Sequence, residues 1–158
     1  MVTEVIEEEI EIEFIVPDLD FGLHKISLTD KLIKLSDRGS SIENEMIILR
    51  NMQELTNWEI TLMATDVPDP ADGQLQLAEW MRFGNNIDDF GIYNTPVSLY
   101  KYDSSNPVQL TNWSSKSEYI IAWSDLEAAN KDIRVINSPA RQAGIYKAIL
   151  TWSVEIVP

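Results

Sequence analysis

Cysteine is absent from the 158-residue sequence, and histidine occurs once, as His24. Without cysteine the chain forms no disulfide bond, no thiolate metal site and no cysteine nucleophile. A zinc site or a Ser-His-Asp triad would depend on that one imidazole, and the motifs GxSxG, HExxH and GxxxxGK(S/T) do not occur. The sequence therefore disfavours an enzyme, and we expect no metal site and no cofactor.

Basic residues are scarce. Lysine and arginine together number 12 against 26 aspartates and glutamates, so the formal net charge is −14 at pH 7. This charge excludes nonspecific attraction to nucleic acid or to anionic lipid. No apolar run approaches the roughly 18 residues that a membrane span needs. No basic-then-apolar leader precedes Val2, so we expect a secretion signal to have been removed or never to have existed.

The overall composition is typical of a globular chain. Apolar residues make up 44% of the sequence and charged residues 24%, which is typical of a folded domain. The length is that of one domain, and we expect residues 1–158 to form it.

Alternation with a period of two is the main pattern, and it begins near the N-terminus. Ile10, Ile12 and Phe14 alternate with glutamates, which predicts a half-buried strand with a carboxylate face. A charged face discourages edge-to-edge pairing. The apolar side chains still need a covering surface, so pairing within the chain's own sheet and self-association through this strand both stay open.

The same period predicts further strands, separated by turn-rich segments. They cover residues 19–28, 57–65, 74–80, 97–102, 118–124, 132–137 and 146–156, and residues 46–49 form a short apolar run. Gly22 indicates a bulge or a close backbone approach, and residues 124–132 can form a helical turn with Ser124 as its cap. The sequence therefore predicts an all-β fold, an antiparallel β-sandwich, immunoglobulin-like or barrel-like, with long irregular loops.

The last predicted strand carries a motif that resembles a known family. GIYKAILTWSVEIVP looks like the signature that closes the WxL domain of Gram-positive bacterial surface proteins, a Y-x-A-x-L-T-W-x-L stretch followed by proline. LDFGLHKIS at residues 19–27 is similar to the family's LDFG-x-H-x-IS segment, and Trp58-Glu59-Ile60 stands where its first tryptophan motif belongs. Both tryptophan motifs lack the final leucine, and Ile60 and Val154 replace it with branched side chains that suit a strand.

The resemblance implies a secreted, extracellular and non-catalytic domain that associates non-covalently with the Gram-positive cell wall. Peptidoglycan is the ligand it implies, and companion surface proteins are further partners. The alternative is a protein–protein interaction module that docks onto a companion WxL-interacting surface protein. A net negative charge would make docking onto a basic partner salt-sensitive, whereas binding to a wall rich in phosphate-bearing polymers would hold or strengthen as salt rises.

The candidate binding residues are the two motif pairs and the other three tryptophans: Trp58, Ile60, Trp152, Val154, Trp80, Trp113 and Trp123. Trp58 and Trp152 lie on alternating apolar faces, which favours a place in the core. Trp80, Trp113 and Trp123 are the better candidates for exposed recognition, although the pattern favours partial burial against a neighbouring strand for each. Exposed tryptophan would suit a sugar ring or a protein patch equally well.

Two acidic groupings invite a chemical interpretation. Asp66, Asp69 and Asp72 surround two prolines but lack the spacing of an EF-hand loop, so we interpret them as a solvated loop. Asp20 and His24 could be imagined as a catalytic dyad, but no motif supports it. We predict no catalytic residue.

Overall fold

The computed structural model describes residues 12–51, 57–88, 91–103, 111–115 and 118–157, with the backbone alone for 111–115 and 157. Twelve strands, two 3-10 helices and one short α-helix follow one another in this part of the chain. In order they are β1 (Glu13–Ile15), β2 (Lys31–Ile33), η1 (Leu35–Arg38), β3 (Met46–Arg50), β4 (Asn57–Thr65), β5 (Gln74–Gln76), η2 (Ala78–Trp80), β6 (Met81–Phe83), β7 (Val97–Tyr102), β8 (Thr111–Ser115), β9 (Glu118–Ala122), α1 (Trp123–Ala128), β10 (Ile133–Asn137), β11 (Ile145–Lys147) and β12 (Ile149–Val157).

One layer of the fold is a three-stranded sheet in the order β12-β4-β7, with β4 antiparallel to both neighbours. Side chains along a strand point alternately to the two faces of its sheet, and β4 follows this rule over its whole length. Its inward side chains are fully buried: Trp58, Ile60, Leu62 and Ala64. This strand is therefore the centre of the core.

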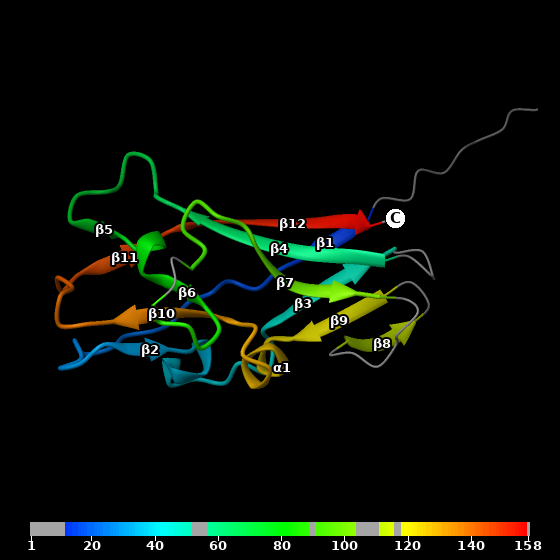
Figure 1. Ribbon diagram of the computed structural model, residues 1–158, viewed down its shortest axis with the longest axis horizontal. Helices are drawn as coiled ribbons and strands as arrows, with labels where there is room; N and C mark the ends of the chain where they lie inside the picture. Colours follow the sequence, from blue (N-terminus) through cyan, green and yellow to red (C-terminus); the bar gives the residue numbers. More distant parts are fainter. Residues whose placement is uncertain (1–11, 52–56, 89–90, 104–110, 116–117, 158) are drawn as a thin grey trace, which may run out of the picture.

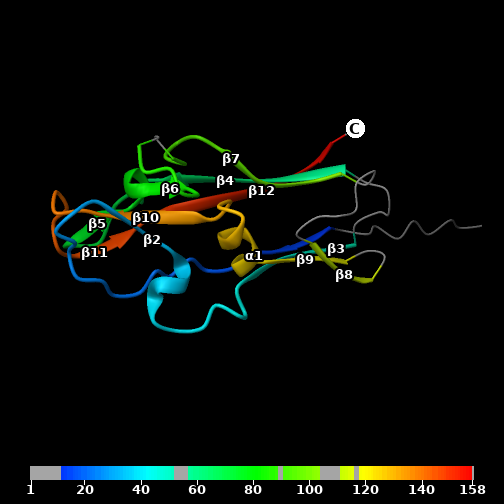
Figure 2. The ribbon, with the colours of Figure 1, turned by 60° about the horizontal axis from the view of Figure 1, so that its bottom comes forward.

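The second layer is a four-stranded antiparallel sheet in the order β1-β3-β9-β8. Ile47 and Leu49 of β3 and Tyr119 and Ile121 of β9 are buried. The Tyr119 ring meets the Trp58 ring edge-on, with 5.2 Å between centroids. Figure 2 shows the two layers one above the other, so the fold is all-β and sandwich-like, as the sequence predicts.

Two smaller sheets lie at the end of the molecule away from the C-terminus (Figure 1). One is antiparallel, in the order β2-β10-β6. The other pairs β11 with β5 in parallel, which departs from the wholly antiparallel arrangement expected. Parallel strands need a long connection, and residues 77–144 supply it.

The last predicted strand, residues 146–156, is in fact two strands that meet at Ala148. β11 pairs with β5 and β12 pairs with β4. The chain passes from one sheet to another here, and a single ladder cannot serve both partners.

The predicted strand at residues 19–28 is absent, and this expectation was wrong. The Gly22 amide donates to Asp20 Oδ1 at 2.9 Å, and His24 Nε2 lies 2.6 Å from the carbonyl oxygen of Phe21. These local hydrogen bonds replace a strand ladder. The close approach at Gly22 is confirmed, because a Cβ there would lie 2.9 Å from the Arg38 carbonyl oxygen.

Two element ends also differ from expectation. α1 begins at Trp123, and its N-cap is Ala122 without a side-chain cap bond, so Ser124 is not the cap. The strand predicted at 118–124 therefore ends at Ala122, and the one predicted at 74–80 ends at Gln76, where the chain then turns into η2.

The strands predicted at 57–65, 97–102 and 132–137 are confirmed within one residue at each end, and the apolar run at 46–49 lies in β3. At the N-terminus only Glu13–Ile15 is a described strand, and Phe14 packs against the core from it. Ile12 precedes the strand and is 43% exposed, so its expected place on the buried face was wrong. Ile10 lies outside the described residues, so that part of the predicted strand stays a prediction.

Candidate functional site

Trp58, the first tryptophan of the WxL-like motifs, belongs to the interior. Its ring stacks on Tyr102 at 5.2 Å between centroids and lies against Tyr100 at 5.4 Å. It has no exposed surface. Ile60, its motif partner, is equally buried, so neither side chain can touch a ligand in this fold, and the interpretation of both as contact residues is corrected.

The second motif lies beside the first, because β12 pairs with β4. Trp152 stands opposite Leu62 and Val154 opposite Ile60. Both Trp152 and Val154 are half-buried and pack against the core. Their motif thus joins two strands that are far apart in the sequence, and its first role is to pack.

Trp123 was a candidate for exposed recognition, and the structure corrects this. It starts α1, is fully buried, and meets the edge of the Trp152 ring at 6.4 Å between centroids. The strand predicted at 118–124 included Trp123, but the chain turns into α1 at this residue, and its ring lies in the core. Trp113 lies in β8 opposite Tyr119; its side chain is outside the described part, so its role stays a prediction.

Trp80 is the tryptophan that the structure places in a polar surface group. The Arg141 guanidinium carbon lies 5.1 Å from the Trp80 ring centroid and 3.9 Å from the Tyr146 ring centroid, both within cation–π range. All three side chains are half-buried. Trp80, Arg141 and Tyr146 form what we call the aromatic–arginine cluster.

Backbone acceptors hold this cluster in place. Arg141 Nη1 donates to the carbonyl oxygen of Ile136, and the Tyr146 hydroxyl donates to that of Gln142 at 2.5 Å. η2, the turn after β10 and β11 each supply one member. Sequence reasoning missed Arg141 because Trp80 lies far from it along the chain and Tyr146 lies five residues after it. No periodicity of a strand or helix brings such positions together.

Among the described residues, the two most exposed large apolar side chains lie in the segment Leu23–Leu28. Leu23 is 101% exposed and Leu28 is 93% exposed, with Ile26 between them at 45%. The Asn137 side chain holds the segment from β10: its amide donates to the Lys25 carbonyl oxygen at 2.7 Å, and its oxygen accepts from the Ser27 amide at 3.1 Å. These bonds fix the backbone while the apolar side chains project, so we call the segment the Leu23–Leu28 loop.

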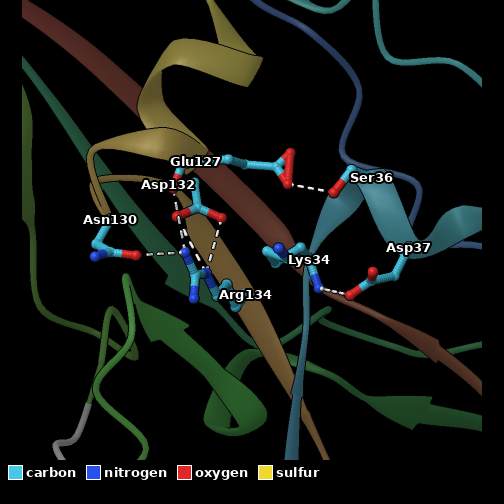
Figure 3. A network of polar contacts seen from close by, with 7 residues as sticks. All are labelled: Lys34, Ser36, Asp37, Glu127, Asn130, Asp132 and Arg134. Carbon is cyan, nitrogen blue, oxygen red and sulfur yellow. Dashed lines mark hydrogen bonds and ion pairs between the residues drawn. The ribbon is translucent and has the colours of Figure 1, made fainter.

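A polar network ties α1 to β10 (Figure 3). Arg134 Nε donates to both oxygens of Asp132, at 3.1 and 3.0 Å, and Arg134 Nη2 donates to Asn130 Oδ1 at 3.0 Å. Asp132 has no exposed surface. On the other side of α1, the Ser36 hydroxyl of η1 donates to Glu127 at 2.5 Å. Asp132 and Arg134 at its centre are buried, whereas Asn130 and Ser36 at its ends are exposed, so we assign the buried pair a structural role.

Surface hydrogen bonds shift the pKa of two exposed groups. The Tyr93 hydroxyl donates to Asp66 at 2.8 Å, and this hydrogen bond raises the pKa of Tyr93. The carboxylate of Glu118 accepts from Arg50 at 2.8 Å and raises the pKa of that guanidinium, with help from Glu13. Neither shift brings a group toward neutral pH, where a general acid or base would have to act.

Metal ligands do not gather in the part of the chain that the structure describes: no three His, Asp or Glu side chains there are placed to hold an ion. Asp66 instead accepts from Tyr93. No helix among the described residues is long and apolar enough to cross a membrane.

Comparisons with known proteins found no matching family model, no matching curated protein and no matching solved structure.

Proposed function

We propose that this chain is a non-catalytic binding domain of a Gram-positive cell surface, which associates non-covalently with the glycan of the cell wall, peptidoglycan. The resemblance of its closing strand to the WxL signature motivates this proposal. The single observation that supports it best is the aromatic–arginine cluster. Tyr146, the first residue of that signature, lies in the cluster against Arg141.

The chemistry of the cluster suits a saccharide that carries acidic groups. Ring faces and edges pack against the apolar faces of sugars, and a guanidinium pairs with a carboxylate through two parallel hydrogen bonds. Arg141 is one of only 12 basic residues in a chain of net charge −14. An acidic glycan is repelled by most of this surface, so a local cation is where it would bind.

The test is sedimentation of the protein with purified peptidoglycan. Loss of one charge-assisted contact corresponds to about tenfold weaker binding. Arg141→Gln should therefore raise the dissociation constant for peptidoglycan, measured by sedimentation, by about that factor. Arg50→Gln is the matched control, because it removes the same charge from an exposed ion pair on β3. Circular dichroism checks that both variants are folded.

Three outcomes contradict this assignment. Equal binding by Arg141→Gln and Arg50→Gln would move the site away from the cluster. Loss of binding in Trp113→Ala alone would move it to β8. Absence of binding by the wild-type chain in both low and high salt would remove the glycan proposal. We expect glycan binding to hold or strengthen as salt rises, since screening weakens the repulsion between two acidic partners.

A second candidate function is docking onto a companion surface protein, and the Leu23–Leu28 loop favours it. Leu23 and Leu28 are almost wholly exposed on a backbone that Asn137 fixes. An apolar pair on an ordered loop fits the centre of a protein interface, where binding energy concentrates. Residues 23–27 of the loop also belong to the segment that resembles the WxL family, and Leu28 follows it directly.

Leu23→Ser with Leu28→Ser tests this second candidate against a purified companion protein. The double variant should lose binding to the protein while keeping its sedimentation with peptidoglycan. Ile149→Ser, which changes another exposed apolar residue, is the matched control. Binding that is unchanged in the double variant would exclude the loop as the docking element.

A further inference from the structure

The outer edge of β12 has no strand beside it in the described part of the chain. β12 is the last strand of its sheet, pairs with β4 alone, and is nine residues long. Figure 1 shows it along the rim of the molecule, with β4 on its inner side. Unpaired backbone amides and carbonyls along such an edge are a template for another strand.

The usual protections of a sheet edge are missing from β12. Its register with β4 runs through nine pairs without a shift, whereas β7, at the opposite edge of the same sheet, has a bulge opposite Ile60/Thr61. β7 also carries Lys101, and β1 at an edge of the other sheet is only three residues long. β12 contains one charged residue, Glu155, and no proline. Long, regular and nearly uncharged edges of this kind pair with other chains.

Exposed apolar side chains accompany this edge. Ile149 is 42% exposed and Ile156 is 52% exposed. Ile156 has the parity of Leu150, Trp152 and Val154, the β12 residues that pack against the core. A strand laid along the edge would therefore extend the core-facing side and cover Ile156.

We propose that β12 pairs antiparallel with β12 of a second copy of this chain, about a two-fold axis at Ser153. This register pairs all nine residues of both strands and joins the two sheets into one of six strands. Ile156 then lies opposite Leu150 of the second copy, on the core-facing side. Glu155 lies opposite Thr151, so no carboxylates face each other across the new pair.

This pairing goes beyond the proposed binding function and does not depend on it. Each copy carries a net charge of −14, so two copies repel one another at low salt and approach more readily when the charges are screened. The association is therefore expected to strengthen as salt rises.

Sedimentation equilibrium across a wide range of protein concentration, in about 0.5 M NaCl, measures the association where the screening length is short. The decisive variants change Thr151, which is exposed and has Glu155 of the second copy as its neighbour in the proposed register. Thr151→Glu places like charges opposite each other twice by symmetry, and Thr151→Lys places opposite charges there. From cross-strand pair energies, the dimer dissociation constant should rise about 2- to 30-fold in the first and fall by a similar factor in the second.

Ser98→Glu and Ser98→Lys are the matched controls, because Ser98 is exposed on β7 at the other edge of the same sheet. They change the net charge equally and should leave the dissociation constant within about twofold of the wild type, as for a surface change away from the contact. A wild-type chain that stays monomeric at every concentration would overturn the proposal. A dimer that responds equally to the Thr151 and Ser98 changes would overturn it as well, since the contact would then lie elsewhere.

Discussion

At the scale of single residues, burial decides which ion pairs contribute to the stability of the fold. The Asp132–Arg134 pair has side-chain exposures of 0% and 8%, whereas Arg50 in its pair with Glu13 is 41% exposed. Exposed pairs contribute little because water and salt screen them. A buried charge that loses its partner has no solvent to replace it. The network between α1 and β10 should therefore dominate the polar contribution to stability.

Asp132→Asn tests this difference. The change leaves the Arg134 guanidinium buried without a counter-charge, so we expect the free energy of unfolding to fall by about 3–5 kcal/mol. Asp72→Asn is the control: Asp72 is exposed, and its change should stay within about 0.5 kcal/mol. Urea unfolding followed by circular dichroism gives both values. Equal midpoints for the two variants would contradict a stabilising role for the buried pair.

At the scale of elements, alternation was a reliable guide where a neighbouring strand supplied a ladder, on both sides for β4 and on one side for β7. β4 and β7 begin and end as the sequence predicts, since each has branched and aromatic side chains on the buried face. Residues 19–28 show the same alternation and form no strand. Gly22 there has a φ of 78°, a left-handed conformation that breaks the pleat.

Gly22 provides a prediction at this scale. Alanine there would place its Cβ 2.9 Å from the Arg38 carbonyl oxygen in addition to adopting a positive φ. Gly39 has a φ of 86°, and a Cβ added there would have nothing within 4 Å, so Gly39→Ala should cost only the backbone strain, about 1–2 kcal/mol. Gly22→Ala should cost more than Gly39→Ala in thermal unfolding. An equal loss of stability in both variants would show that the η1 backbone at Arg38 shifts to accommodate the added Cβ at no measurable cost.

At the scale of the whole molecule, net charge opposes compactness. A charge of −14 on 158 residues places many carboxylates on one surface, and their mutual repulsion is larger in the folded chain than in the expanded one. Screening relieves this repulsion. The Debye length falls from about 30 Å at 0.01 M salt to about 3 Å at 1 M.

We therefore expect the melting temperature to rise by a few degrees as NaCl increases from about 0.01 M to about 0.5 M, since about 1 kcal/mol corresponds to roughly 2–4 °C for a chain of this size. Thermal unfolding at two protein concentrations separates this effect from dimer formation, which would make the melting temperature depend on concentration. A melting temperature that falls or stays constant with salt would show that repulsion is not a main destabilising term.

Local patterns in the sequence determined the all-β class, most of the long strands and the burial of Trp58. The reason is physical: successive side chains of a strand point to opposite faces, so a period of two records burial within a few residues. The closing segment could be identified as strand for the same reason, although its break at Ala148 could not.

Only the tertiary structure decided which side chains reach the surface and which meet one another. Trp123 is fully buried whereas Trp80 is half-buried, although both lie within two residues of a charged side chain along the chain. The parallel pairing of β5 with β11, the contact of Arg141 with Trp80 and the open edge of β12 all follow from segments far apart in sequence. Exposure depends on which distant segment covers a residue, and a local period contains no record of that.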